Sequence, residues 1–161
     1  MPVRRPLDVE QELVETFEQC GRATEHLVSV VPRRVWDLPS PTGHGRTIAA
    51  IFTHMHGLRK MIAKMGGARV GPSLDRKTVT PEQVRRALRE INDTLTTMFR
   101  ESLGRGEARV KGISRRSVNI MMYLVQHDAH HRGQITWLAR DLGHKFNTID
   151  TMKIWGWKKL D

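Results

Sequence analysis

The stretch Ser117–Gly143 combines a helical apolar pattern with histidines, and this combination constrains the chain more than any other feature. Apolar and histidine side chains recur at steps of three or four residues, the spacing of one helix face: Ile120, Leu124, His127, His131, Ile135 and Leu138. A histidine removed from water needs partners for its ring nitrogens, because each unpaired nitrogen costs about 1–3 kcal/mol. One ion shared by two rings would satisfy both of them.

A metal ion between His127 and His131 is therefore one interpretation of this stretch. Residues four apart on a helix have Cβ atoms about 5–6 Å from each other, so both rings can reach one zinc ion at the roughly 2.0–2.1 Å that zinc requires. The alternative is a pair of ordinary polar residues on a half-exposed helix, since short motifs often occur without a metal. A third ligand from another part of the chain would favour the metal.

His54 is the candidate for that third ligand. It lies in the predicted helix Thr47–Lys64, three residues after Ile51 and four before Leu58, which places it on the apolar face. His56 is turned by about 200° from His54 at about 100° per residue, so we interpret His56 as peripheral.

Four amphipathic helices and no strand pattern predict an all-α fold, a four-helix bundle with a long loop between the first and second helices. The predicted helices are Asp8–Val31, Thr47–Lys64, a third from the Thr80 start signal to about Leu103, and Ser117–Gly143. The loop Pro32–Arg46 contains Trp36, which we expect to pack it down. A length of 161 residues predicts a single domain, residues 1–161.

Facing helices of a bundle can place His54, His127 and His131 around one ion. Three imidazoles with an open position are typical of a catalytic zinc site, or of a site for nickel or another late divalent metal. Asp128 and Gln134 are candidates to orient the ligand rings from outside. His130 lies off the His127 direction, so we expect it behind the ligand rings or at the rim of the site and not as a first-choice ligand. His26 and His44 are expected at the surface.

Composition limits the remaining classes of function. Cys20 is the one cysteine, so an intrachain disulfide is excluded, and this fits a reducing cytoplasm. Cys20 belongs to the apolar stripe of the first helix, which indicates a core residue. The sequence contains no run of about 18 consecutive apolar residues, so no membrane-spanning helix is predicted. The net charge of +10 is spread along the chain, without a nucleic-acid-binding motif, so binding of nucleic acid is not favoured.

The histidine segments resemble the DinB-like (DNA-damage-inducible) family. The resemblance rests on RTIAAIFTHMHGLRKM at 46–61, LVQHDAHHRGQI at 124–135 and the later DLGH, and it extends over most of the chain. The family includes mycothiol- and bacillithiol-dependent S-transferases. The resemblance implies a four-helix bundle, often dimeric, with a divalent metal bound by the residues at His54, His127 and His131.

Two classes of function follow as hypotheses. As an enzyme, the protein would use its metal to ionise a low-molecular-weight thiol, whose thiolate attacks an electrophilic small molecule. Arg59 and Arg132 are then expected near the mouth of the site, to bind an anionic substrate or cofactor. As a non-enzyme, it would be a metal-binding stress-response or dimeric interaction protein. We expect Trp155 and Trp157 to cap the apolar end of the bundle or to meet another subunit, which predicts a homodimer.

Overall fold

The computed structural model describes residues 6–158 and 160 of the predicted single domain, and residues 1–5, 159 and 161 lie outside the described part. It contains six helices: α1 (Val9–Val30), α2 (Arg33–Trp36), α3 (Ile48–Met65), α4 (Pro81–Gly104), α5 (Ser117–Asp141) and α6 (Thr148–Ile154). No strand occurs among the described residues, so the predicted all-α class is confirmed. None of the described helices is long and apolar enough to cross a membrane.

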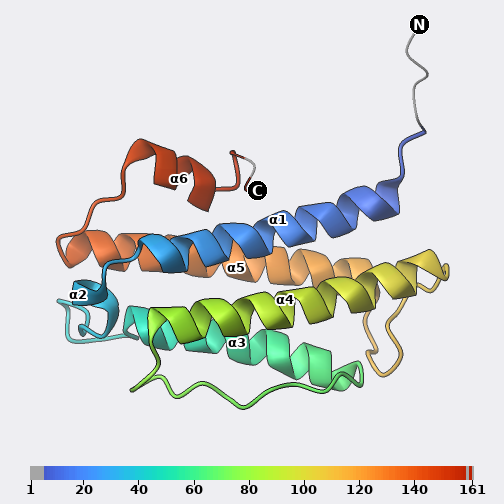
Figure 1. The fold of residues 1–161 in the computed structure, drawn as a ribbon, viewed down its shortest axis with the longest axis horizontal. Helices are drawn as coiled ribbons and strands as arrows, with labels where there is room; N and C mark the ends of the chain where they lie inside the picture. Colours follow the sequence, from blue (N-terminus) through green and yellow to red (C-terminus); the bar gives the residue numbers. More distant parts are fainter. Residues whose placement is uncertain (1–5, 159, 161) are drawn as a thin grey trace, which may run out of the picture.

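The four long helices α1, α3, α4 and α5 lie side by side, as Figure 1 shows. Helices α1 and α3 each pack against both α4 and α5. The second and fourth of the predicted helices, α3 and α5, are therefore neighbours, which is the arrangement that the three predicted histidine ligands require.

The helix boundaries follow local capping signals. The Thr80 hydroxyl accepts a hydrogen bond from the Gln83 backbone N–H, and the Gln83 side chain accepts one from the Thr80 N–H, so the capping box predicted at the start of α4 is confirmed. Thr47 caps α3 through the Ala50 N–H. Gly143 follows α5 with a φ of 82°, which a glycine adopts without strain.

Two apolar clusters form the core, one toward each end of the long helices. Trp36 is fully buried in the first cluster, donates its indole N–H to the Val79 carbonyl at 2.9 Å and stacks on Phe52. Its predicted role in packing down the first loop is confirmed, although that loop also forms the short helix α2. Phe17 and Phe99 meet edge to face in the second cluster.

Polar side chains lie between the two apolar clusters in each long helix. They are all buried: Thr24 on α1, Arg59 on α3, Asn92 on α4, and Asp128 and Arg132 on α5. These residues bond to one another across the helices, as buried polar groups generally do, although the Asn92 Nδ2 atom has no partner within the described part of the chain.

The C-terminal segment packs over α1 through the short helix α6 (Figure 1). His26 on α1 is partly exposed and lies 2.9 Å from the Asp150 carboxylate on α6, so it is a surface residue that is paired with the C-terminal segment. Trp155 and Trp157 are 73% and 79% exposed, which contradicts the expectation that they cap the end of the bundle.

Candidate metal centre

Three imidazoles from two neighbouring helices converge on one point. The Nε2 atom of His127 lies 3.3 Å from Nε2 of His54 and 3.1 Å from Nε2 of His131. Helix α3 supplies His54, and α5 supplies the other two from successive turns. One ligand atom from each ring lies within 4.8 Å of the other two. The residues selected from helix faces in the sequence are therefore together in space.

The spacing of these nitrogens fits a shared metal ion. Two nitrogens that each lie about 2.0–2.1 Å from one ion in tetrahedral geometry are about 3.3 Å apart. A neutral imidazole carries one N–H, so three Nε2 atoms facing one another cannot all be satisfied by hydrogen bonds among themselves. A cation at their centre satisfies all three, and three protein ligands leave a position for a further ligand.

Gln134 fixes the orientation of His131. Its amide oxygen lies 2.7 Å from Nδ1 of His131, and an oxygen acceptor there requires the ring to carry its proton on Nδ1. The Nε2 atom of His131 is then an unprotonated lone-pair donor that faces the other two rings. Gln134 occupies the ring-orienting place that the sequence suggested for it.

Asp128 engages the site less directly than Gln134 does. The Nδ1 atom of His127 is buried and has no hydrogen-bond partner among the described residues, and the nearby Asp128 Oδ1 is 3.8 Å away. This distance is too long for a hydrogen bond, although the negative charge still favours a proton on Nδ1. The carboxylate of Asp128 is instead bonded to Arg59 and to the Thr24 hydroxyl.

Arg59 and Asp128 form a bidentate ion pair beneath the histidines. Both N–H···O distances are 2.8 Å, and the two side chains are almost completely removed from solvent. Burial by itself raises the pKa of Asp128, but the Arg59 guanidinium and the Thr24 hydrogen bond outweigh it and hold the pKa below its usual range. Arg59 is 0% exposed, so its expected position near the mouth of the site is wrong.

Arg132 is also buried, with an exposed fraction of 8%, and its expected position near the mouth is wrong as well. Its guanidinium donates to the Thr24 hydroxyl at 3.1 Å and to the Cys20 sulfur at 3.3 Å. Cys20 is a buried core residue, as predicted, and burial followed by the Asp128 charge raises the pKa of its thiol. Arg132 therefore connects α5 to α1 within the core.

The pKa values of two of the three converging histidines are lowered. Burial lowers the pKa of His54, and the charges of Arg46 and His127 lower it further. Burial also lowers the pKa of His131, while its hydrogen bond to Gln134 acts in the opposite direction. Both rings are therefore neutral at pH 7, which is the state that a metal ligand requires.

A cavity of about 880 Å³ lies beside the cluster on the side of Gln134, the hydrogen-bond partner of His131, and the three histidines themselves are not among its lining residues. Gln134 and the exposed His130 line it, and the His130 ring centroid is 5.1 Å from that of His131, a position at the rim. Arg46 and Trp137 also line this cavity, and neither was selected from the sequence. Trp137 is 70% exposed, with its indole N–H bonded to Asp141 at 2.8 Å. An exposed tryptophan leaves no signal in an apolar periodicity, because it falls outside the stripe.

His56 lies on the other side of α3, away from His54. It is only 6% exposed, so its peripheral assignment is wrong, although it takes no part in the three-histidine cluster. Helix α4 and the segment 66–80 cover this side of α3. Side chains on two opposite sides of α3 are therefore buried, those of one side against α5 and those of the other against α4 and this segment.

An all-α fold with three converging imidazoles defines a helical protein with a candidate metal centre. The model of the DinB family matches residues 5–158, nearly the whole chain, so the chain belongs to the DinB family. Comparisons with curated proteins and with solved structures gave no match.

Proposed function

We propose that His54, His127 and His131 bind a divalent metal ion, zinc or nickel, through their Nε2 atoms. The observation that carries this proposal is the spacing of 3.1 and 3.3 Å between those atoms. The lowered pKa values of His54 and His131 support it, because they favour the neutral rings, and the Gln134 acceptor supports it further, because it leaves the Nε2 atom of His131 unprotonated.

We further propose that the centre activates a low-molecular-weight thiol for transfer to an electrophilic small molecule. A divalent ion held by His54, His127 and His131 would supply a Lewis acid able to lower the pKa of a thiol. In the transfer, the thiol proton goes to water, the sulfur forms a bond to the electrophilic carbon, and the leaving group departs with the electrons of its former bond.

Residues of the cavity beside the histidines are suited to orient these reactants. The Arg46 guanidinium is a cation close enough to lower the pKa of His54, and it can bind an anionic group of the thiol or the electrophile. The exposed Trp137 offers an apolar ring surface held in place by Asp141. Arg46 thus takes the place that Arg59 and Arg132 were expected to fill.

The test is the disappearance of a chromogenic electrophile in the presence of bacillithiol, mycothiol or glutathione, with protein purified without a histidine tag and loaded with zinc or nickel. We expect a metal-dependent rate with one of these thiols, and loss of that rate in His54→Ala. Arg46→Gln should raise the KM for the reactant that carries an anionic group, whereas Lys64→Gln at the end of α3 should not. Metal binding without a rate for any thiol would favour a non-catalytic, metal-binding stress-response protein.

We also propose a homodimer that buries the exposed Trp155 and Trp157, because two large aromatic side chains in a short segment seldom remain in water. Sedimentation should give the mass of two chains at micromolar concentration, and replacement of both tryptophans by serine should give the mass of one. A single-chain mass for the unmodified protein would contradict this arrangement.

The lone buried cysteine suits a cytoplasmic location, where low-molecular-weight thiols stay reduced.

A further inference from the structure

A second cavity, of about 640 Å³, lies on the side of α3 that faces away from His54. Helix α3 contributes His56 and Lys60 to its wall, α4 contributes residues from Gln83 to Thr94, and the segment 69–79 covers it. His54 and His56 are turned by about 200° from each other on the helix, so α3 separates this cavity from the three-histidine centre.

His56 is a buried polar side chain that the protein itself leaves without a partner. It is 6% exposed and lines the cavity, yet its ring makes no hydrogen bond or ion pair with any residue that the structure describes. Its ring nitrogens are not among the fully buried atoms that lack a partner, so solvent reaches them from the cavity and a molecule bound there can take the place of that water.

Three cations surround the same cavity, one from each of its walls: Lys60 from α3, Arg69 from the covering segment and Arg86 from α4. None of them forms an ion pair within the described part of the chain, and the Lys60 ammonium donates to the Ser73 hydroxyl at 2.9 Å. The lining also contains the carboxylates of Asp75 and Glu90, so the cations are in excess.

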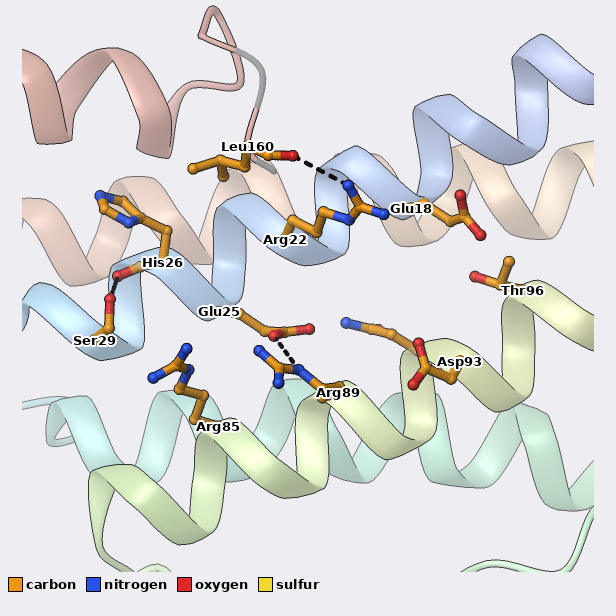
Figure 2. Close-up of a pocket in the computed structure, with 11 residues that line it drawn as sticks. Glu18, Arg22, Glu25, His26, Ser29, Arg85, Arg89, Asp93, Thr96 and Leu160 are labelled. Atoms are coloured by element: carbon orange, nitrogen blue, oxygen red, sulfur yellow. Dashed lines mark hydrogen bonds and ion pairs between the residues drawn. The ribbon is translucent and has the colours of Figure 1, made fainter.

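The groove between α1 and α4 has a different charge arrangement, which Figure 2 shows. Arg89 there donates to Glu25 at 3.0 Å, and Arg22 donates to the Leu160 carbonyl at 3.1 Å. Because these cations already have partners and three carboxylates share the lining, the groove offers no excess positive charge.

We propose that the cavity between α3 and α4 binds a small organic anion through a phosphate or carboxylate group. Lys60, Arg69 and Arg86 supply the charge-assisted hydrogen bonds, and His56 supplies a further bond from the wall formed by α3. The buried side chains of Val79 and Ile91 form an apolar part of the lining, which suits an anion with a short hydrocarbon body. This site is independent of the proposed metal centre.

Calorimetric titration of the full chain with phenyl phosphate, benzoate and inorganic phosphate at constant ionic strength tests the proposal. The protein is titrated both metal-loaded and after chelation, because a metal ion can itself bind these anions. We expect saturable binding that survives chelation and the His54→Ala substitution. Tighter binding of phenyl phosphate than of benzoate would identify a phosphate as the recognised group, and the reverse order would identify a carboxylate.

Arg85 and Arg86 provide a matched pair of variants. Both are exposed residues of α4 and carry the same charge, but Arg85 lines the groove between α1 and α4 (Figure 2) while Arg86 lines the proposed site. Arg86→Gln and Lys60→Gln should each weaken binding roughly tenfold, and Arg85→Gln should leave it unchanged. The proposal is overturned by equal weakening in Arg85→Gln and Arg86→Gln, by binding that chelation abolishes, or by the absence of saturation with all three anions.

Discussion

The Nε2 atoms of His127 and His131 lie 3.1 Å apart, one turn apart on α5, and face the His54 ring on α3. Two nitrogens at this distance are too close for both to remain as unprotonated lone pairs without a proton or a cation between them. A metal ion bound by His127, His131 and the opposing His54 explains why these nitrogens lie so close together.

We expect His54→Ala, His127→Ala and His131→Ala each to lose most of the bound metal. Each substitution leaves two protein ligands, whereas a catalytic zinc site has three, so the ion should bind much more weakly. The measurement is elemental analysis of untagged protein after dialysis. His54 is the most informative of the three positions, because it is partly exposed and its removal should disturb the fold least.

His130→Ala and His56→Gln are the controls for this series, since both histidines lie outside the cluster. They should retain most of the metal. If His130→Ala loses the metal while His54→Ala retains it, the assignment of the ligands is wrong.

The sequence predicted the helices and the histidine cluster because both depend on local, periodic signals. The capping box at Thr80 and Gln83 marks a helix start from four consecutive residues. The three-residue and four-residue steps around His54 and His131 identify a helix face without any knowledge of the neighbouring helix. The short helices α2 and α6 span 4 and 7 residues, too few for a periodic pattern to be recognised.

The errors in the prediction concern partners that are distant in sequence. Arg59 is buried because Asp128, 69 residues later, neutralises it, and no pattern around Arg59 announces that pair. The sequence pattern places His56 on the outside only if the helix has a single apolar face. Helix α3 packs against both α4 and α5, so residues on two of its sides are covered.

Metal affinity should be nearly constant above about pH 6.5 and should fall below it, because protons then compete for the ligand nitrogens. The pKa values of His54 and His131 are lowered in the folded protein, which shifts the loss of affinity to lower pH than for free imidazole. The unfolded chain takes up these protons more readily, so the metal-free protein should also lose stability as the pH falls through the unfolded value of about 6.5. Competition with a chromophoric chelator measures the affinity, and an affinity that starts to fall well above pH 7 would contradict the prediction.

Asp128→Ala should destabilise the metal-free protein by about 3–5 kcal/mol, because it leaves the Arg59 charge buried without a partner. Glu18→Ala removes the half-buried partner of the exposed Arg100 and should cost less than about 1 kcal/mol. Urea unfolding gives both values. The double variant Arg59→Met with Asp128→Leu should recover much of the loss, since no unpaired charge remains. Equal losses for Asp128→Ala and Glu18→Ala would show that breaking the buried ion pair costs no more free energy of unfolding than breaking the surface ion pair.

Gly21 and Gly57 should respond in opposite directions to alanine. A Cβ atom at Gly21 would lie 2.6 Å from the Asn92 Nδ2 atom, so Gly21→Ala should destabilise the protein by about 1–3 kcal/mol. A Cβ atom at Gly57 meets nothing within 4 Å, and alanine favours the helix there by about 0.5–1 kcal/mol. Thermal unfolding of the two variants should move in opposite directions. A stabilised Gly21→Ala variant would mean that α1 and α4 are less closely packed than described.

Gln134→Leu should weaken metal binding by about 10–100-fold, because the His131 Nδ1–H group then loses its acceptor at 2.7 Å and the ring loses its fixed orientation. Gln134 is exposed, so its replacement should leave the fold intact. Gln126→Leu is the matched control, an exposed glutamine on the same helix that does not line the cavity. Chelator competition at pH 7 measures both variants, and unfolding curves verify their stability. Equal affinities for the two variants would show that Gln134 does not position His131.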